Sequence, residues 1–537
     1  MQSTNTKPIL TTDGLSVAFG DTTVLHDISL ELHPDEVLGV VGETGAGKSV
    51  LARSLIDLLP GKGRISGGQV LIDGKNLQAM SPQERRQLRG GKISLIGTDA
   101  KSLLDPVRPV GAQVADVLQA HKGLSAKQAK AEAIEIFTQV GIVDPESRAE
   151  AYPHQLSGGM AQRVVIAMAL IAEPEVILAD DATLGLDATI QVQVLDLLLA
   201  RCREAGVAAV IITHDLGIVA RYCSRVAIMR DGRIVEDGET RTFLNRPSTA
   251  YGAELLSAAR ARPVPMTVQD SEEGAADQPI IEVVNLVKHF NTSSGHVVKA
   301  VDDVSFAIRP GETLALVGES GSGKTTVGQC LVRLLETDRG AVLFRGKDVL
   351  PLSDGLFRPL RRDIQMVFQE PYVALNPRWT VDRLVAEPLA LNPEMKSAAQ
   401  RRDRVMEMLE LVGLRPAQAE AFPHELTAGE QKRVGMARAL VTKPGFVVFD
   451  EPTTALDIRV RAQIIDLVRD LQSEMNLATL FITHDLNSVR SLAHRVAVMR
   501  YGKIVETGET ERIFSRPRDN YTKMLLGAEL PIESFAG

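Results

Sequence analysis

The sequence predicts an α/β fold that contains two tandem nucleotide-binding domains of the P-loop type. Two stretches, GETGAGKS at Gly42–Ser49 and GESGSGKT at Gly318–Thr325, each follow an apolar strand-like run and open a helix-like segment. This strand–loop–helix context distinguishes a phosphate-binding loop from a chance match. The glycines let successive backbone N–H groups turn toward an anion, and the next helix adds its positive N-terminal end. Two matches in the same setting predict two nucleotide sites.

The residues of each phosphate-binding loop have expected roles. Lys48 and Lys324 are expected to reach the β- and γ-phosphates, whereas Ser49 and Thr325 are expected to hold Mg²⁺. The full set expected to bind nucleotide comprises Gly42, Glu43, Thr44, Gly45, Ala46, Gly47, Lys48 and Ser49 in the first loop, and Gly318, Glu319, Ser320, Gly321, Ser322, Gly323, Lys324, Thr325 and Thr326 in the second.

Length and composition indicate a multidomain globular chain. Its 537 residues exceed what one hydrophobic core usually supports, and 44% of them are hydrophobic. The net charge of −8, without basic blocks, argues against nucleic acid as a partner. No apolar run approaches the roughly 18 residues of a membrane span, and the N-terminus lacks a secretory signal. Cys202, Cys223 and Cys330 are scattered without metal-type spacing, which favours a reduced cytoplasmic chain with buried thiols.

An internal repeat divides the chain into two halves. Asp180 and His214 in the first half recur at one common offset as Asp450 and His484 in the second. The expected boundaries are a first nucleotide-binding domain at 1–262, a linker at 263–279 and a second domain at 280–537. The linker is rich in proline, acidic and small residues, so we interpret it as a flexible spacer rather than a binding site.

The pattern of each half predicts its elements in the same order. Alternating segments such as LSVAFG and TTVLHDISLEL predict an antiparallel β layer, and continuous apolar runs such as EVILAD, AAVIIT, GFVVFD and ATLFIT predict buried parallel strands. Polar, helix-prone regions at Asp99–Pro153 and Glu370–Pro423 predict an inserted helical lobe. The segments RVAIMRDGRIVEDG and RVAVMRYGKIVETG predict hairpins that turn at 231–232 and 501–502.

Polar residues at strand ends of the second half suggest hydrolytic chemistry. In FVVFDEPTTALD, Asp450 is expected to coordinate Mg²⁺ and Glu451 to take a proton from the attacking water. His484, in FITHD, is expected to hydrogen-bond the γ-phosphate; a lone histidine would more often be structural, but this one recurs as His214. Gln369, in MVFQEP, offers an amide that can meet both Mg²⁺ and water.

A further motif, LSGGMAQR at Leu156–Arg163, places a Gly-Gly turn at the start of an amphipathic helix. Together with the P-loops, strand-end carboxylates and histidines, it resembles the ATP-binding cassette (ABC) ATPase family, once per half and over nearly the whole chain. The resemblance implies ATP and Mg²⁺ as cofactors, and two ABC-type domains, each with a mixed sheet core, an antiparallel β layer and a helical subdomain. Cassettes of that family pair head to tail, so Ser157, Gly158 and Gly159 would close over ATP on the second P-loop. The short linker favours such pairing within one chain, as a pseudo-dimer.

The resemblance also implies two unequal ATP sites. The site on the second P-loop matches the family pattern throughout. In the first half, Asp181 replaces the catalytic glutamate, which withdraws the carboxylate by roughly 1 Å, and Thr98 stands at the position of Gln369. The second signature reads LTAGE, with Thr427 and Ala428 in place of serine and glycine. The groups left there to bind nucleotide and metal are Lys48, Ser49, Asp180 and His214, so we expect ATP to be held but poorly hydrolysed.

Two aromatic residues and the three cysteines complete the comparison. Phe19 and Phe290 lie upstream of their P-loops, where family members stack an aromatic ring on adenine; packing in the core is an equally weighted alternative. Some importer relatives carry a four-cysteine cluster, whereas this chain has three scattered cysteines, so no iron–sulfur centre is expected.

The ends of both halves indicate a transport role. The segments RPSTAYGAELL and RPRDNYTKMLL resemble those of cassettes in peptide and nickel importers. The leading hypothesis is the ATP-hydrolysing, energy-coupling subunit of an importer for peptides or related solutes, of the oligopeptide, glutathione or microcin type, peripheral on the cytoplasmic face of the inner membrane. Its partners would be two membrane-spanning permease subunits and an extracytoplasmic solute-binding protein. The alternative is a soluble tandem cassette protein that acts on ribosomes or DNA; a kinase-like enzyme would leave LSGGMAQR unexplained.

Overall fold

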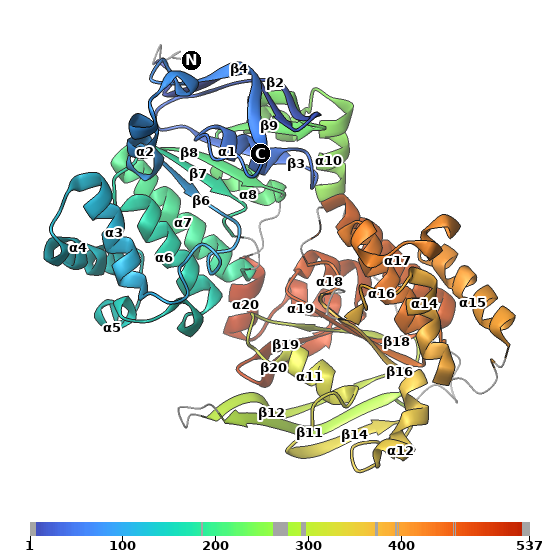
Figure 1. Ribbon diagram of the computed structural model, residues 1–537. Helices are drawn as coiled ribbons and strands as arrows, with labels where there is room; N and C mark the ends of the chain where they lie inside the picture. The colour runs from blue at the N-terminus through green and yellow to red at the C-terminus, as the bar shows by residue number, and fades with distance from the viewer. Residues whose placement is uncertain are drawn as a thin grey trace.

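The chain folds into two halves of the same design (Figure 1). The computed structural model describes residues 7–183, 186–260, 278–291, 297–370, 374–391, 395, 397–454, 456 and 458–528. The linker predicted at 263–279 lies outside the described residues except for positions 278 and 279.

The first half contains an antiparallel sheet of order β2-β1-β4-β5 and a second sheet of order β10-β9-β3-β8-β7-β6. In the second sheet β10 runs antiparallel to β9, and the other neighbours are parallel. The strands are β1 (Leu10–Phe19), β2 (Thr22–Leu32), β3 (Val37–Gly42), β4 (Gly63–Ile72), β5 (Lys75–Asn76), β6 (Ile93–Ile96), β7 (Val176–Asp180), β8 (Ala208–Thr213), β9 (Arg225–Arg230) and β10 (Arg233–Glu239). The predicted antiparallel layer and buried parallel strands are confirmed.

The helices of the first half include a lobe built from α3, α4 and α5, which contact one another beside α6 (Figure 1). Ser125 caps α4 through a reciprocal bond with Gln128. The helices are α1 (Lys48–Ser54), α2 (Pro82–Gly91), α3 (Val110–Lys122), α4 (Ala126–Gln139), α5 (Pro145–Ala149), α6 (Gly158–Leu170), α7 (Ala188–Ala205), α8 (Leu216–Tyr222), α9 (Thr240–Asn245) and α10 (Ala250–Arg260), with 3-10 turns η1 (Leu77–Ala79) and η2 (Pro153–Gln155). This lobe is the helical insertion that the sequence predicts.

The second half repeats both sheets, in the orders β12-β11-β14-β15 and β16-β17-β18-β13-β19-β20. Its strands are β11 (Ile281–Asn291), β12 (Val297–Ile308), β13 (Thr313–Val317), β14 (Arg339–Phe344), β15 (Lys347–Asp348), β16 (Ile364–Val367), β17 (Phe446–Asp450), β18 (Ala478–Thr483), β19 (Arg495–Arg500) and β20 (Lys503–Glu509). Its helices are α11 (Lys324–Leu331), α12 (Asp354–Phe357), α14 (Val381–Ala386), α15 (Ala398–Leu411), α16 (Ala428–Leu440), α17 (Ile458–Met475), α18 (Leu486–Leu492), α19 (Thr510–Ser515) and α20 (Asn520–Gly527), with 3-10 turns η3 (Arg358–Arg362), η4 (Glu387–Leu391), η5 (Pro416–Glu420) and η6 (Pro423–Glu425).

The order of the parallel strands decides where the polar residues meet. Strands β13, β18 and β17 lie side by side and run in the same direction, so their carboxyl ends share one edge of the sheet. All side chains of these strands are buried, which explains their continuous apolar sequence. The P-loop, His484 and Asp450 follow or end these strands and therefore meet at that edge.

The two halves touch through their terminal helices. Helix α10, which ends the first half, contacts α17 of the second half, and α20, which ends the second half, contacts α7 of the first (Figure 1). Each contact joins the last helix of one half to the helix that follows the strand-end carboxylates of the other.

Within the described ranges, no helix combines the length and apolar character needed to cross a membrane.

The predicted hairpins are confirmed and also connect the sheets of each half. In the second hairpin Tyr501 and Gly502 have φ values of 48° and 81°, and the Gly502 carbonyl accepts a hydrogen bond from the Asp302 N–H at 2.8 Å. A Cβ atom at Gly502 would overlap the carbonyl oxygen of Lys299 on β12. The glycine is therefore required both by its backbone conformation and by the close approach of β12.

We expect Gly502→Ala to lower the thermal stability of the chain more than Gly346→Ala. Gly346 occupies the same turn position in the β14–β15 connection, with a φ of 77°, but a Cβ there would meet no atom within 4 Å. Both changes carry the strain of a left-handed residue, roughly 1 to 3 kcal/mol, and only Gly502→Ala adds the clash with β12. Differential scanning calorimetry measures both; equal losses would contradict the role assigned to β12.

Candidate active site

Each P-loop wraps around the amino group of its own lysine. Lys324 is buried, and its Nζ donates to the carbonyl oxygens of Gly318 and Glu319 at 2.7 and 3.0 Å. Burial lowers the pKa of Lys324, against the raising effect of the neighbouring carboxylates. Gly323 has a φ of 105°, and a Cβ there would overlap the Ala300 carbonyl oxygen, so the loop requires glycine at this position.

The first P-loop has the same arrangement. Lys48 is buried, and its Nζ donates to the carbonyl oxygens of Gly42 and Glu43 at 2.7 and 2.9 Å. In each half the lysine is the first residue of the following helix, and its amino group is bonded to carbonyl oxygens of its own loop.

The hydroxyl that follows each lysine is bonded to the strand-end aspartate. Thr325 Oγ1 donates to Asp450 Oδ1 at 3.1 Å, and Ser49 Oγ donates to Asp180 Oδ1 at 2.9 Å. Burial raises the pKa of Asp450 to about 6 and also raises the pKa of Asp180. A cation beside these carboxylates would favour their charged form, so the two hydroxyl–carboxylate pairs fit the donor set of a Mg²⁺ site.

Three neighbouring side chains contact the Glu451 carboxylate. Its Oε2 accepts from Gln369 Nε2 at 2.9 Å and from Thr454 Oγ1 at 3.0 Å, and its Oε1 lies 3.3 Å from His484 Nδ1. Its backbone has a φ of 45°, and its N–H donates to the Ile482 carbonyl of the next strand. A left-handed glutamate held by the surrounding structure is the kind of local strain found at functional sites.

The charges around Glu451 keep it ionised. Burial alone would raise the pKa of Glu451, but the bond to His484 and the charge of Lys324 outweigh burial and lower it. In the same pair, burial would lower the pKa of His484, and Glu451 raises it above the usual value. The carboxylate is therefore unprotonated at neutral pH, as a proton acceptor must be.

The first half reproduces the backbone of this arrangement but not all of its contacts. Asp181 has a φ of 44°, and its N–H donates to the Ile212 carbonyl, as Glu451 does in the second half. His214 Nδ1 lies 3.2 Å from Asp181 Oδ1. Thr98 is exposed, and no hydrogen bond joins it to Asp181 among the described residues.

The two signature motifs begin helices but bond differently. Ser157 caps α6, and its hydroxyl oxygen accepts from the Met160 N–H at 3.3 Å. Thr427 caps α16, and its Oγ1 and N–H both donate to Glu430 Oε2, at 2.8 and 2.9 Å. Glu430 was not singled out in the sequence; a carboxylate three residues after a threonine cap is the signal that would have found it.

A buried lysine beside Glu451 was also missed. Lys432 on α16 is 7% exposed, and its Nζ donates to the Gln369 carbonyl at 3.4 Å. Burial lowers the pKa of Lys432 to about 8, although the Glu451 charge acts in the other direction. The corresponding residue of the first half is the buried Gln162, so the amino group is a feature of the second half.

The two proposed adenine-stacking residues lie in different surroundings. Phe19, at the end of β1, packs against the core of the first half. Phe290, on β11, is 38% exposed, and Lys288 Nζ lies 5.4 Å from its ring centroid. Phe19 is partly buried, whereas Phe290 leaves more of its ring surface open to solvent.

Two further contacts reach the second P-loop from outside it. The Ser320 N–H donates to Asp187 Oδ1 of the first half at 2.7 Å, and the Glu319 N–H donates to the Tyr521 hydroxyl oxygen at 2.9 Å. Neither Asp187 nor Tyr521 was assigned a role from the sequence.

The three cysteines are each buried, as expected, and burial raises the pKa of Cys202 to about 12 and that of Cys330 to about 11.

Comparison with known proteins identifies the family of the chain. The family model described as "ABC transporter" matches residues 25–184 and again 301–454. The chain is 42% identical to the Peptidoglycan transport ATP-binding protein YejF of Agrobacterium fabrum, over 99% of this chain and 98% of that protein. It is 40% identical to the Glutathione import ATP-binding protein GsiA of Salmonella typhimurium, over 98% of this chain and 90% of that protein. An uncharacterized ABC transporter ATP-binding protein, YejF of Escherichia coli, is 39% identical, over 97% of this chain and 99% of that protein.

The chain belongs to the ABC transporter family and is an ATP-binding, ATP-hydrolysing member of it. The predicted fold class, the tandem arrangement of two cassettes and the resemblance to importer ATPases are confirmed. The predicted energy-coupling role in an ABC importer is supported over the alternative of a soluble protein that acts on ribosomes or DNA.

We expect Lys432→Gln to raise the melting temperature at pH 7, with a gain that shrinks toward pH 10. The pKa of Lys432 is about 8 in the folded chain against 10.5 for an unperturbed lysine, so its buried charge costs stability at pH 7. Between these two pKa values the folded chain releases the proton before the unfolded chain does, so stability rises with pH. Glutamine carries no charge and removes both the destabilisation at pH 7 and this rise in stability. Calorimetry at the two pH values, with the exposed Lys523→Gln as control, measures this difference. A loss of stability at pH 7, or a gain independent of pH, would contradict it.

Proposed function

We propose that the chain powers the import of peptides or related small solutes, and that it hydrolyses ATP mainly on the second P-loop. The observation that carries this proposal is the Glu451 carboxylate, which Gln369 and His484 hold beside the Thr325–Asp450 pair. A fixed, ionised carboxylate next to a phosphate-binding loop and a metal-type pair is the arrangement that hydrolysis of a phosphoanhydride requires.

Each group of this site has a proposed role in the reaction. Lys324 and the P-loop N–H groups would bind the β- and γ-phosphates, and Thr325, Asp450 and Gln369 would hold Mg²⁺. When bound, Mg²⁺ neutralises negative charge on the phosphates. Glu451 accepts a proton from water as the water oxygen bonds to the γ-phosphorus and the bond to the β–γ bridging oxygen breaks. His484 orients Glu451 through Nδ1 and hydrogen-bonds the γ-phosphate.

The first P-loop is proposed to hold ATP without efficient hydrolysis. Lys48, Ser49, Asp180 and His214 supply binding groups, but Asp181 is one methylene shorter than Glu451 at the same backbone conformation. The resulting displacement of about 1 Å can cost on the order of 10²-fold in rate. Thr98 supplies no amide to hold the shorter carboxylate.

The two halves are proposed to pair head to tail, so that each signature faces the P-loop of the other half. The Asp187–Ser320 bond supports this orientation, because it joins the segment after the first strand-end carboxylates to the second P-loop. In this pairing Ser157, Gly158 and Gly159 serve the second P-loop. The other signature offers Thr427, Ala428 and the Glu430 carboxylate. This carboxylate accepts a hydrogen bond from the Thr427 hydroxyl and adds negative charge where a phosphate would approach. The weaker site therefore also has the weaker signature.

The transport role rests on the relatives. Their names assign them to peptidoglycan transport and to glutathione import, and this chain matches them over nearly its full length. We infer peptide-like solutes, two membrane-spanning permease subunits and an extracytoplasmic solute-binding protein as partners, and a peripheral position on the cytoplasmic face of the inner membrane. Movement of the halves would reach the permeases through the helical lobes that contain α3–α5 and α14–α15.

Glu451→Gln should reduce steady-state ATP hydrolysis by about 10²- to 10⁴-fold while ATP binding remains, because the amide cannot accept the proton. The matched change Asp181→Asn should reduce hydrolysis far less, since its site contributes little turnover. Phosphate release measures the rate, and equilibrium dialysis with labelled ATP measures binding. Residual hydrolysis above half the native rate in Glu451→Gln, or equal losses from both variants, would overturn the assignment.

ATP hydrolysis should be slow in the isolated chain and should rise when it is reconstituted in vesicles with its permeases and loaded binding protein. Glutathione and a mixture of short cell-wall peptides serve as probe solutes, following the names of the relatives. The Glu451→Gln chain, assembled in the same way, controls for contaminating ATPase. An assembled complex in which neither solute changes hydrolysis or enters the vesicles would contradict the proposed substrate class.

A further inference from the structure

We infer that Tyr521, in the last helix of the chain, is a positioning residue that couples the second P-loop to the contact between the two halves. The inference rests on the proposed function, in which the second P-loop holds the ATP that is hydrolysed. It adds a role for the C-terminal segment, whose resemblance to importer cassettes gave no physical explanation for its presence.

Two consecutive P-loop amides are held by groups outside the loop. The Glu319 N–H donates to the Tyr521 hydroxyl oxygen at 2.9 Å, and the next amide, Ser320 N–H, donates to Asp187 Oδ1 at 2.7 Å. The first bond comes from α20 of the same half and the second from the start of α7 in the other half. Because both act on one short loop, a displacement of either helix is transmitted to the phosphate-binding backbone.

Tyr521 is fixed in place by its surroundings. Its side chain is 3% exposed, and the Arg500 guanidinium lies 4.6 Å from its ring centroid. Burial raises the pKa of Tyr521 to about 12, so the phenol is neutral and its oxygen can accept a hydrogen bond at physiological pH.

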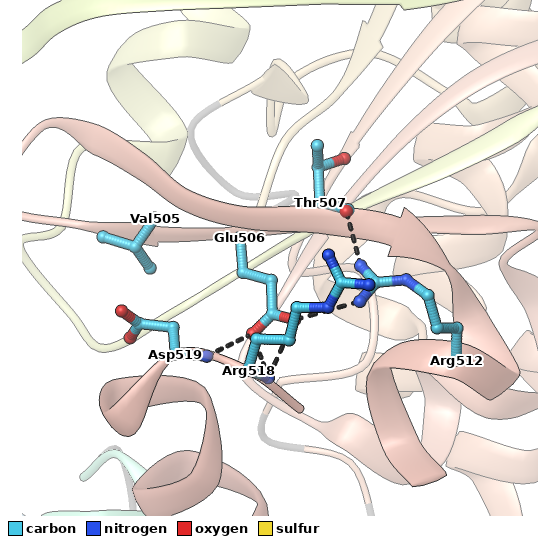
Figure 2. Close-up of a pocket in the computed structure, with 6 residues that line it drawn as sticks. All are labelled: Val505, Glu506, Thr507, Arg512, Arg518 and Asp519. Atoms are coloured by element: carbon cyan, nitrogen blue, oxygen red, sulfur yellow. Dashed lines mark hydrogen bonds and ion pairs between the residues drawn. The ribbon is translucent and has the colours of Figure 1, made fainter. Parts of the chain in front are cut away.

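The helix that carries Tyr521 is also anchored, as Figure 2 shows. The buried Glu506 carboxylate accepts from the backbone N–H groups of Arg518 and Asp519, at 3.1 and 3.0 Å, and pairs with Arg512 at 3.2 Å. Asp519 then caps α20 by accepting from the Tyr521 N–H at 2.8 Å. The Glu506 carboxylate thereby fixes the start of α20 to β20, and this attachment determines the position of Tyr521 relative to the P-loop.

The two helices that support the P-loop amides, α20 and α7, also contact each other. Helix α20 contacts α7, and Asp187 is the residue that precedes α7. The Asp187 side chain makes no capping bond to its own helix, so its described hydrogen bond is the one to Ser320. A change in the separation of the halves shifts α7 against α20 and alters the support of Glu319 and Ser320 together.

The test uses Tyr521→Phe in the full-length chain, which keeps the ring and its contact with Arg500 but removes the hydroxyl. Loss of this hydrogen bond should raise the KM for ATP roughly fivefold and leave kcat nearly unchanged. Tyr251 is the matched control, because it lies on α10 at the equivalent position, 4.7 Å from the Arg230 guanidinium. Tyr251→Phe should leave the KM for hydrolysis unchanged, since its half contributes little turnover.

A double-mutant cycle separates positioning from packing. Asp187→Ala alone should also raise KM, and the combined variant should raise it by less than the product of the two single effects, because both bonds support one loop. Multiplicative effects, or a native KM in Tyr521→Phe, would overturn the inference. Lys324→Ala separates a failure of this inference from a failure of the proposed function. If Lys324→Ala abolishes hydrolysis while Tyr521→Phe has no effect, only this inference fails. If Lys324→Ala hydrolyses ATP normally, the proposed function and this inference both fail.

Discussion

The bond between Thr325 and Asp450 is the constraint on which the catalytic arrangement depends. It ties the first turn of α11 to the end of β17, so the P-loop and the strand-end carboxylates have a fixed separation. Glu451 follows directly in a left-handed conformation, which turns its side chain away from the buried strand and toward Gln369 and His484. The Ser49–Asp180 bond provides the same constraint in the first half. The scaffold of the two sites is therefore equivalent, and their difference lies in the side chains placed on it.

This equivalence makes the proposed asymmetry physically specific. Asp181 and Glu451 share nearly the same φ and the same backbone bond to the adjacent strand, so side-chain length separates them rather than a distorted fold. In the second half three neighbours hold the carboxylate, whereas the described contact of Asp181 is with His214. In the proposed function, these local side-chain differences leave ATP binding at both sites and efficient hydrolysis at only one.

Features set by local sequence were predictable, and features set by distant contacts were not. The P-loops, the hairpin at 501–502 and the buried strands follow from short patterns, and the repeat showed them twice. Glu430 and Lys432 act through burial and bonding that depend on where α16 packs. Asp187 and Tyr521 gain their roles only because the second P-loop lies beside the other half and the last helix. No pattern within one segment contains that proximity.

The two ATP sites of one chain are proposed to differ in hydrolysis. The most direct measurement of this difference is the nucleotide content of the native chain, trapped by rapid mixing with labelled ATP and Mg²⁺ and quenched after a single turnover. We expect two bound nucleotides per chain, one recovered as ADP and the other as intact ATP. Recovery of both as ADP would show that the first P-loop hydrolyses ATP as well as the second, and would contradict the proposed difference between the two sites.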